Sequence, residues 1–153
     1  MELKNKKVLV TGASSGIGQA IALLLAREGA HVAFTYNSNE AGANETLSQL
    51  GENGMKFKVD MHNEEEIRDL FAKLSQKWNK LDILVNNAGV NRPRGLFNPD
   101  DWREIFQIDV FAVVLCTGLA VDLMKNTGKI LNITSIYGFA EACYKGIAPY
   151  GAA

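Results

Sequence analysis

Short apolar runs alternate along the chain with longer segments in which apolar residues recur at helical spacing. The apolar runs, typical of parallel strands covered on both faces, are residues 7–11, 31–36, 55–59, 81–85 and 129–134. The segments with helical spacing are residues 16–28, 39–50, 64–78 and 101–124. This alternation predicts one α/β domain built on a doubly wound parallel sheet with right-handed crossovers.

Composition narrows the classes of function. The 153 residues suffice for one domain, and a net charge of −1 gives no field that would recruit nucleic acid or an anionic membrane. The N-terminus lacks the apolar stretch of a signal peptide, and we expect no later run to reach the ~20 residues that span a bilayer. We therefore expect no nucleic-acid or membrane partner and a cytoplasmic location. Cys116 and Cys143 are expected to be reduced thiols, and the isolated His31 and His62 predict no metal site.

A glycine-rich turn joins the first predicted strand to the first predicted helix. Residues 11–18 read TGASSGIG, in which Gly12 permits a tight turn, Gly16 lets the backbone approach a ligand and Gly18 lets the helix pack closely on the sheet. The N-terminus of the helix offers free N–H groups and a positive dipole end to a pyrophosphate. The turn therefore predicts a dinucleotide site.

Four motifs together resemble those of the short-chain dehydrogenase/reductases, and most of all the branch of 3-oxoacyl-acyl-carrier-protein reductases and sugar-alcohol dehydrogenases. They are TGASSGIG at 11–18, Asp60 after the third predicted strand, NNAG at 86–89, and Ser135 followed by Tyr150. The resemblance implies a Rossmann-like sheet with strand order 3-2-1-4-5. It covers only the first part of such proteins, so we expect a single domain, residues 1–153, that is C-terminally incomplete and lacks the last strands and helices of the full fold.

The same resemblance assigns the cofactor contacts. The pyrophosphate and adenosine ribose would be held by Gly12, Ser14, Ser15, Gly16, Ile17 and Gly18. Asp60 would accept a hydrogen bond from the adenine amino group, with Met61 stacked nearby, although a carboxylate at a strand end is also a common cap for the next helix. The nicotinamide ribose would lie over Asn87, Ala88 and Gly89, whereas Asn86 is expected to brace the centre of the sheet.

The end of the second predicted strand distinguishes NAD from NADP, because a carboxylate there pairs with the 2′-hydroxyl and repels a 2′-phosphate. The sequence reads Tyr36-Asn37-Ser38, with no acidic residue before Glu40. We therefore expect NADP rather than NAD, with Ser15, Asn37 and Ser38 as donors to the phosphate, although no Arg or Lys stands in this motif to clamp it.

In the resembling family a serine polarises the substrate carbonyl and a tyrosine supplies the proton. Ser135 and Tyr150 occupy these positions, and Tyr150 also contacts the cofactor. The alternatives are that Ser135 only caps a strand end and that Tyr150 is an ordinary buried aromatic. Tyr137 and Tyr144 are competing tyrosines that lack the small residues found after Tyr150.

Two departures from the family pattern concern charge at this site. A phenol has a reference pKa of about 10 and ionises near neutrality only beside positive charge, which the family provides with a lysine four residues after the tyrosine. The sequence stops at Ala153, one residue before that position. Asp109 stands where the family has an asparagine that holds a water of the proton relay. With such a lysine present, Asp109 would pair with it; without one, its charge would oppose formation of the phenolate. If the helical register differs, Asp109 is instead a surface residue.

Two hypotheses follow. One is an oxidoreductase acting on a ketone or secondary alcohol with NADP(H), and the other is a nucleotide-binding but catalytically inactive truncated product or regulator. The resemblance also implies that the full-length protein is a homo-oligomer, a dimer or a tetramer, that uses the 101–124 segment. One apolar side of this segment holds Ile105, Ile108, Ala112 and Leu115, and another holds Phe106, Val110, Val113 and Leu119. Two apolar sides fit burial against both the sheet and a neighbour, although core burial alone explains much of them.

Overall fold

The computed structural model describes residues 3–91, 98–125, 127–139 and 146–153. Five parallel strands form one sheet in the order β3-β2-β1-β4-β5, which confirms the predicted fold class and strand order. The strands are β1 (Lys7–Val10), β2 (His31–Tyr36), β3 (Gly54–Lys58), β4 (Ile83–Asn86) and β5 (Lys129–Asn132).

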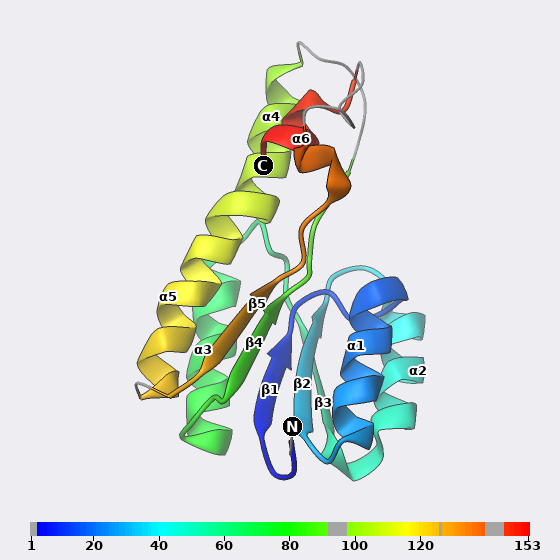
Figure 1. Cartoon of the computed structure of the whole chain (residues 1–153), viewed down its shortest axis with the longest axis vertical. Helices are drawn as coiled ribbons and strands as arrows, with labels where there is room; N and C mark the ends of the chain where they lie inside the picture. The colour runs from blue at the N-terminus through cyan, green and yellow to red at the C-terminus, as the bar shows by residue number, and fades with distance from the viewer. Residues whose placement is uncertain (1–2, 92–97, 126, 140–145) are drawn as a thin grey trace.

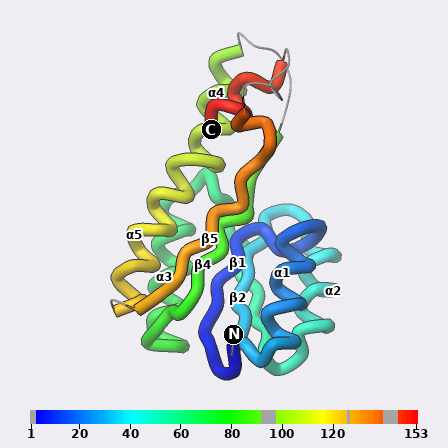
Figure 2. Tube along the Cα trace, in the orientation of Figure 1, coloured from blue at the N-terminus to red at the C-terminus, as the bar shows by residue number. Residues whose placement is uncertain are grey.

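Helices cover both faces of this sheet, as Figure 1 shows. On one side lie α1 (Gly16–Arg27) and α2 (Glu40–Leu50), and on the other α3 (Glu64–Trp78) and α5 (Ala112–Met124). The remaining helical elements are η1 (Gly51–Asn53), α4 (Pro99–Phe106), η2 (Gln107–Phe111), η3 (Ile136–Gly138) and α6 (Ala148–Ala152). In the trace of Figure 2, α4 and α6 lie together beyond the carboxyl ends of the strands, and the two helices are in contact. The loops that bear the predicted motifs open at this end of the sheet.

A separate hydrophobic cluster fills the space on each face of the sheet. Val8, Val10 and Phe34 are fully buried beneath α1 and α2, whereas Leu9 and Leu84 are fully buried against α3 and α5. The alternation follows from the period of two along a strand, and it explains why the strands read as continuous apolar runs. The two covered faces hold the carboxyl ends of β1, β2 and β4 in fixed register.

The element boundaries depart from the sequence predictions by at most two residues. The fourth strand starts at Ile83 instead of 81, because the N–H of Leu81 donates to the carbonyl of Leu123 outside the sheet. The predicted fifth strand, 129–134, ends at Asn132. The predicted start of the long helix at residue 101 is also wrong: the helix begins at Pro99, since Asn98 caps it by accepting from the N–H of Asp100.

The long helix is not regular. Residues Gln107–Phe111 form a π-helical turn, η2, which joins α4 to α5 without a break in the chain's helical path. Such a turn inserts one residue into the i→i−4 ladder, and π turns are frequent at functional sites. Asp109 lies in this turn, so it is not a surface residue produced by a slip of register.

Helix α5 buries one stripe of side chains and exposes another. Ala112, Cys116, Ala120 and Met124 are buried against α3 and the sheet, and burial raises the pKa of the free Cys116 thiol to about 12. Phe111, Val114 and Val121 are exposed. The second apolar side that the sequence predicts is half-buried; it consists of Phe106, Val110, Val113 and Leu119. Cys143 and Tyr144 lie outside the described residues.

The expectation that no run is long enough to span a bilayer is wrong in one respect. The continuous helix Pro99–Met124 has 26 residues and passes the test of length and apolar composition for a membrane span. Its buried stripe packs in the hydrophobic core against α3, but only 28% of the apolar window is buried, so core packing accounts for only part of its apolar character.

Candidate functional site

The glycine turn between β1 and α1 is shaped by two steric constraints. Gly12 has a φ of 67°, and a Cβ there would lie 2.9 Å from the Cα of Ala88. A Cβ on Gly18 would collide with the carbonyl oxygen of Gly12 and with Nδ2 of Asn87. Any side chain at either position would therefore push α1 away from the end of β4.

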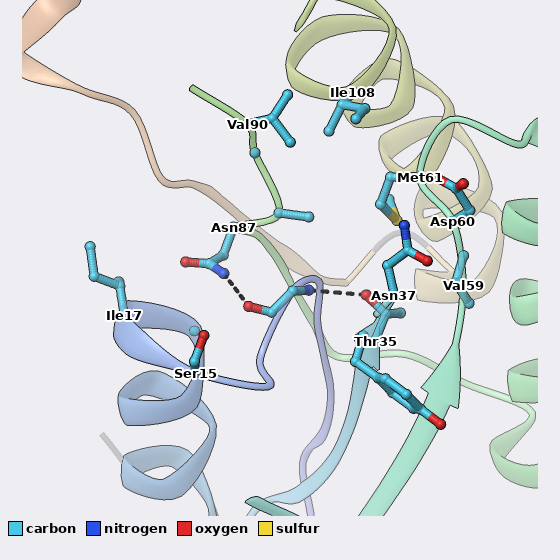
Figure 3. A pocket seen from close by; sticks show the side chains of 15 residues that line it. Ser15, Ile17, Thr35, Asn37, Val59, Asp60, Met61, Asn87, Val90 and Ile108 are labelled. Atoms are coloured by element: carbon cyan, nitrogen blue, oxygen red, sulfur yellow. Dashed lines mark hydrogen bonds between the residues drawn. The ribbon is translucent and has the colours of Figure 1, made fainter. Parts of the chain in front are cut away.

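Hydrogen bonds fix this turn to its neighbouring strands (Figure 3). The N–H of Gly12 donates to Oγ1 of Thr35 at 3.0 Å, which ties the turn to β2. Nδ2 of Asn87 donates to the carbonyls of Thr11 and Gly12 at 2.9 and 2.8 Å. The turn is thus rigid before any ligand arrives, which lowers the entropic cost of binding.

The first turn of α1 is left open to an anion. Its N-cap residue, Ser15, makes no side-chain capping bond, and no acidic residue lies in its first turn. Helices α2, α3 and α4 are instead capped by the side chains of Asn39, Asn63 and Asn98. The free N–H groups and positive dipole end of α1 therefore face the adjoining cleft without internal compensation.

The cleft runs from this helix tip across the ends of β1, β2, β3 and β4. It is lined by eleven of the predicted cofactor residues: Gly12, Ser15, Ile17, Gly18, Tyr36, Asn37, Asp60, Met61, Asn87, Ala88 and Gly89. Ser14, Ser38 and Gly16, the first residue of α1, adjoin these residues in the chain but do not line the cleft, and neither does Tyr150. The sequence reasoning missed Thr35, Val59, Val90 and Ile108, which also line it.

Asp60 stands across the cleft from Asn87 in Figure 3. Its Oδ1 accepts from the N–H of His62 at 2.9 Å, and α3 is capped by Asn63, which accepts from the N–H groups of Glu65 and Glu66. The alternative reading of Asp60 as the helix cap is therefore wrong. Met61 is buried beside it, so an apolar surface and a carboxylate adjoin where the adenine is predicted.

The adenosine end of the cleft carries few charges near β2. The hydroxyl of Tyr36 donates to Oε1 of Glu40 at 3.5 Å, and the ammonium of Lys56 lies 5.3 Å from the centroid of the Tyr36 ring. Lys56 also lies 3.8 Å from Oε1 of Glu40 and donates to Asn44. The carboxylate of Glu40 thus has a cationic partner, and the exposed Asn37 is the polar side chain left at the strand end.

A second hollow adjoins the cleft, sharing with it Ile17 and the segment from Asn87 to Val90. Ser135, Tyr150 and Asp109, the three predicted catalytic residues, all line this hollow. The Oγ of Ser135 accepts from the N–H of Tyr137 at 3.2 Å, so Ser135 caps the short helix η3 and also faces the hollow. Tyr150 is half-buried on α6 and meets the ring of Tyr137 edge-on, with centroids 6.3 Å apart.

Asp109 is joined directly to the segment after β4. Its Oδ1 accepts from the N–H of Val90 at 2.9 Å. Burial raises the pKa of the Asp109 carboxyl to about 6, although the bond from Val90 acts in the opposite direction. Among the described residues that line the hollow there is no Lys, Arg or His.

Asn86 has the bracing role predicted for it. Its Nδ2 donates to Oδ1 of Asn132 at 2.9 Å and to Oγ1 of Thr117 at 3.3 Å. It therefore ties β4 to β5 and to α5 directly beneath the segment that lines both the cleft and the hollow.

The fold and site define a doubly wound nucleotide-binding α/β domain whose cleft lies at the carboxyl ends of the strands, where the strand order reverses. A family model described as short chain dehydrogenase matches residues 6–153. The chain belongs to this short-chain dehydrogenase family.

Individual relatives agree with this family. A 3-oxoacyl-(acyl-carrier-protein) reductase of Vibrio cholerae is 37% identical over 142 residues, which are 90% of this chain and 58% of that protein. A 3beta-hydroxysteroid dehydrogenase of Mediterraneibacter gnavus is 35% identical over 139 residues, 87% of this chain and 50% of that protein. A short chain dehydrogenase from Burkholderia cenocepacia, solved in complex with NADP, superposes with a TM-score of 0.92 at 30% identity, covering 99% of this chain and 64% of that one. The chain thus spans about half the length of these curated relatives.

Proposed function

We propose that this chain carries the cofactor cleft and the reacting side chains of an oxidoreductase that transfers a hydride between NADP(H) and a ketone or secondary alcohol. The observation that supports this most strongly is the continuity of two sites. The cleft at the open tip of α1 shares its wall, from Asn87 to Val90, with the hollow that holds Ser135 and Tyr150.

The residues present fit a nicotinamide dinucleotide. Gly12 and Gly18 leave space that a Cβ would fill, and the uncapped N–H groups of α1 suit a diphosphate. Asp60 and Met61 would hold the adenine, and Asn87, Ala88 and Gly89 the nicotinamide ribose. When bound, the reduced nicotinamide supplies a hydride to the carbonyl carbon.

The side chains in the hollow would manage the oxygen of the substrate. Ser135 would donate its Oγ–H to the carbonyl oxygen and so polarise the C=O bond. Tyr150 would give its phenolic proton to the same oxygen as the alkoxide develops, which completes the alcohol; the reverse reaction returns the proton to Tyr150. Tyr150→Phe should lower the rate of NADPH oxidation with a ketone by at least ~100-fold and leave NADPH binding within about threefold.

The matched control is Tyr137→Phe, which keeps the ring contact between residues 137 and 150. A normal rate in the Tyr150→Phe variant would refute the assignment of Tyr150.

NADP rather than NAD is proposed because no unpaired carboxylate stands at the end of β2. Glu40, the first acid after the strand, is held by Lys56, and Ser15 and Asn37 line the cleft as donors. Asn37→Asp should weaken NADPH binding by roughly tenfold or more and favour NADH, because a carboxylate repels the 2′-phosphate. Fluorescence titration with both nucleotides measures this, and Asn53→Asp, in the exposed η1 turn, should change neither affinity.

A second candidate is a nucleotide-binding chain without turnover. It is favoured by the hollow itself, where Asp109 adds negative charge and the described lining residues supply no cation to stabilise a Tyr150 phenolate. Nucleotide binding together with no detectable ketone reduction, in the wild-type chain, would support this candidate over the enzyme.

The expected homo-oligomer stays a prediction. Phe111, Val114 and Val121 are exposed and form the face that we expect to be the interface. Comparing the mass of the wild type and of a Val114→Asp variant by light scattering would test the homo-oligomer.

A further inference from the structure

Asp109 places a carboxylate at the junction of the cleft and the hollow. A Cβ built on Gly89 would lie 3.4 Å from Oδ1 and 3.6 Å from Oδ2 of Asp109, so the carboxylate packs against the backbone of Gly89. The N–H of the next residue, Val90, donates to Oδ1 at 2.9 Å. Both Gly89 and Val90 line the cleft and the hollow, so Asp109, which itself lines the hollow, lies against the wall that the two sites share.

The charge of this carboxylate has no partner of opposite sign among the groups described around it. The described side chains that line the hollow include one other group that ionises, the phenol of Tyr150, and none that is cationic. Asp60, the carboxylate that lines the cleft, lies at its far side beyond β2. A half-buried and unpaired charge acts over several ångströms with little screening.

The two redox states of a nicotinamide differ by one unit of charge on the ring. The oxidised ring is a cation and the reduced ring is neutral, so a nearby carboxylate stabilises only the oxidised form. We infer that Asp109 biases the chain toward the oxidised nicotinamide, so that it discriminates NADP⁺ from NADPH by charge. The inference rests on the proposed function, because it requires a nicotinamide nucleotide in this cleft.

A purely structural role for Asp109 makes a different prediction. If the side chain only anchors Val90, an asparagine would serve equally well, because its Oδ1 accepts the same hydrogen bond. Asp109→Asn therefore removes the charge and keeps the anchor, whereas Asp109→Ala removes both.

The test is a titration of the wild type and Asp109→Asn with NADP⁺ and with NADPH at pH 8, where the carboxyl is ionised. We expect the Kd for NADP⁺ to rise roughly five- to thirtyfold in the variant, as the loss of one charge pair predicts, and the Kd for NADPH to change by less than about twofold. Asp122→Asn, on the exposed side of α5, is the matched control and should leave both values unchanged.

A second variant covers the case in which Asp109→Asn fails to fold. Val113→Lys places a cation in the same hollow without removing the bond from Asp109 to Val90, and it should weaken NADP⁺ relative to NADPH in the same direction.

Two results would overturn the inference. If Asp109→Asn leaves the ratio of the two affinities unchanged, including the case in which both nucleotides bind equally more weakly, the charge has no such role and the proposed function stands. If the wild type binds neither nucleotide, the proposed function fails and the inference fails with it.

Discussion

The N-termini of α1 and α3 expose the same backbone groups and treat them in opposite ways. At α3, Asn63 accepts from two backbone N–H groups, and Glu64, Glu65 and Glu66 occupy the first turn. At α1, Ser15 makes no capping bond and the first turn holds no acid. One helix satisfies its positive end with its own side chains, whereas the other presents it to a cleft. The comparison shows where an anionic ligand is bound most strongly. It is at a helix start that lies at the carboxyl edge of a parallel sheet and whose N–H groups are not capped by the protein's own side chains.

The largest effect should come from closing the open tip of α1. In Gly18→Val, the side chain would collide with the Gly12 carbonyl and with Asn87, so α1 must shift away from the turn. We expect a loss of about 3 kcal/mol in the free energy of unfolding and no measurable binding of NADPH. Urea unfolding and fluorescence titration check the two parts.

The matched control for that change is Gly118→Val on α5, where nothing lies within 4 Å of the added Cβ. If Gly18→Val binds NADPH as the wild type does, the close packing of α1 on the turn is irrelevant to the ligand.

A smaller effect should follow from giving α1 the acid that α3 already has. Ile17 is 64% exposed, so Ile17→Glu should leave the fold intact while placing a carboxylate beside the predicted pyrophosphate. We expect NADPH binding to weaken by roughly tenfold or more, with the loss reduced at high salt. Leu24→Glu, on the same helix and 58% exposed, should bind as the wild type does. Equal losses in both variants would mean that added charge, wherever placed on α1, causes the effect.

Removing the cap of α3 should affect stability alone. Asn63→Ala leaves the N–H groups of Glu65 and Glu66 without their side-chain acceptor, so the free energy of unfolding should fall by about 1 kcal/mol. The Kd for NADPH should not change, since the described residues that line the cleft include none from α3. If NADPH also binds more weakly, in a titration under conditions where both proteins are folded, the N-terminus of α3 affects binding at the N-terminus of α1.

The smallest effect should come from one charge in the first turn of α3. Oε2 of Glu64 lies 3.8 Å from Nη2 of Arg68 on an exposed surface. Glu64→Gln should lower the free energy of unfolding by only about 0.3–0.5 kcal/mol at low salt, and the difference should vanish near 1 M NaCl. A difference that persists in high salt would point to packing rather than charge.

The sequence predicts the layered sheet well because continuous apolar runs mark strands that are covered on both faces, and apolar residues at helical spacing mark the helices between them. The sequence also locates the glycine turn, because the close contacts at Gly12 and Gly18 leave no room for a Cβ and so require glycine. The π turn escaped prediction because Gln107–Phe111 have ordinary helical composition. Ile108 was missed as a lining residue of the cleft for the same reason, since its direction depends on that turn.

Contacts between segments that are distant in the sequence were the other feature that could not be predicted from it. The bond between Val90 and Asp109 joins residues 19 positions apart, and the bonds from Asn87 to the glycine turn join residues more than 70 positions apart. A motif names such residues but does not say which hydrogen bond each makes. Asp60 illustrates this, because the geometry alone shows that Asn63 takes the capping role.

The π turn also constrains how this region tolerates changes in length. Five π-helical residues turn through about the same angle as four α-helical residues, so deleting one residue from 107–111 would restore a regular α-helix and leave the phase of α5 nearly unchanged. The stripe of Ala112, Cys116, Ala120 and Met124 would therefore stay in the core. The deletion would instead change the turn that holds Asp109 beside Val90, so a single-codon deletion here should damage the site more than the fold.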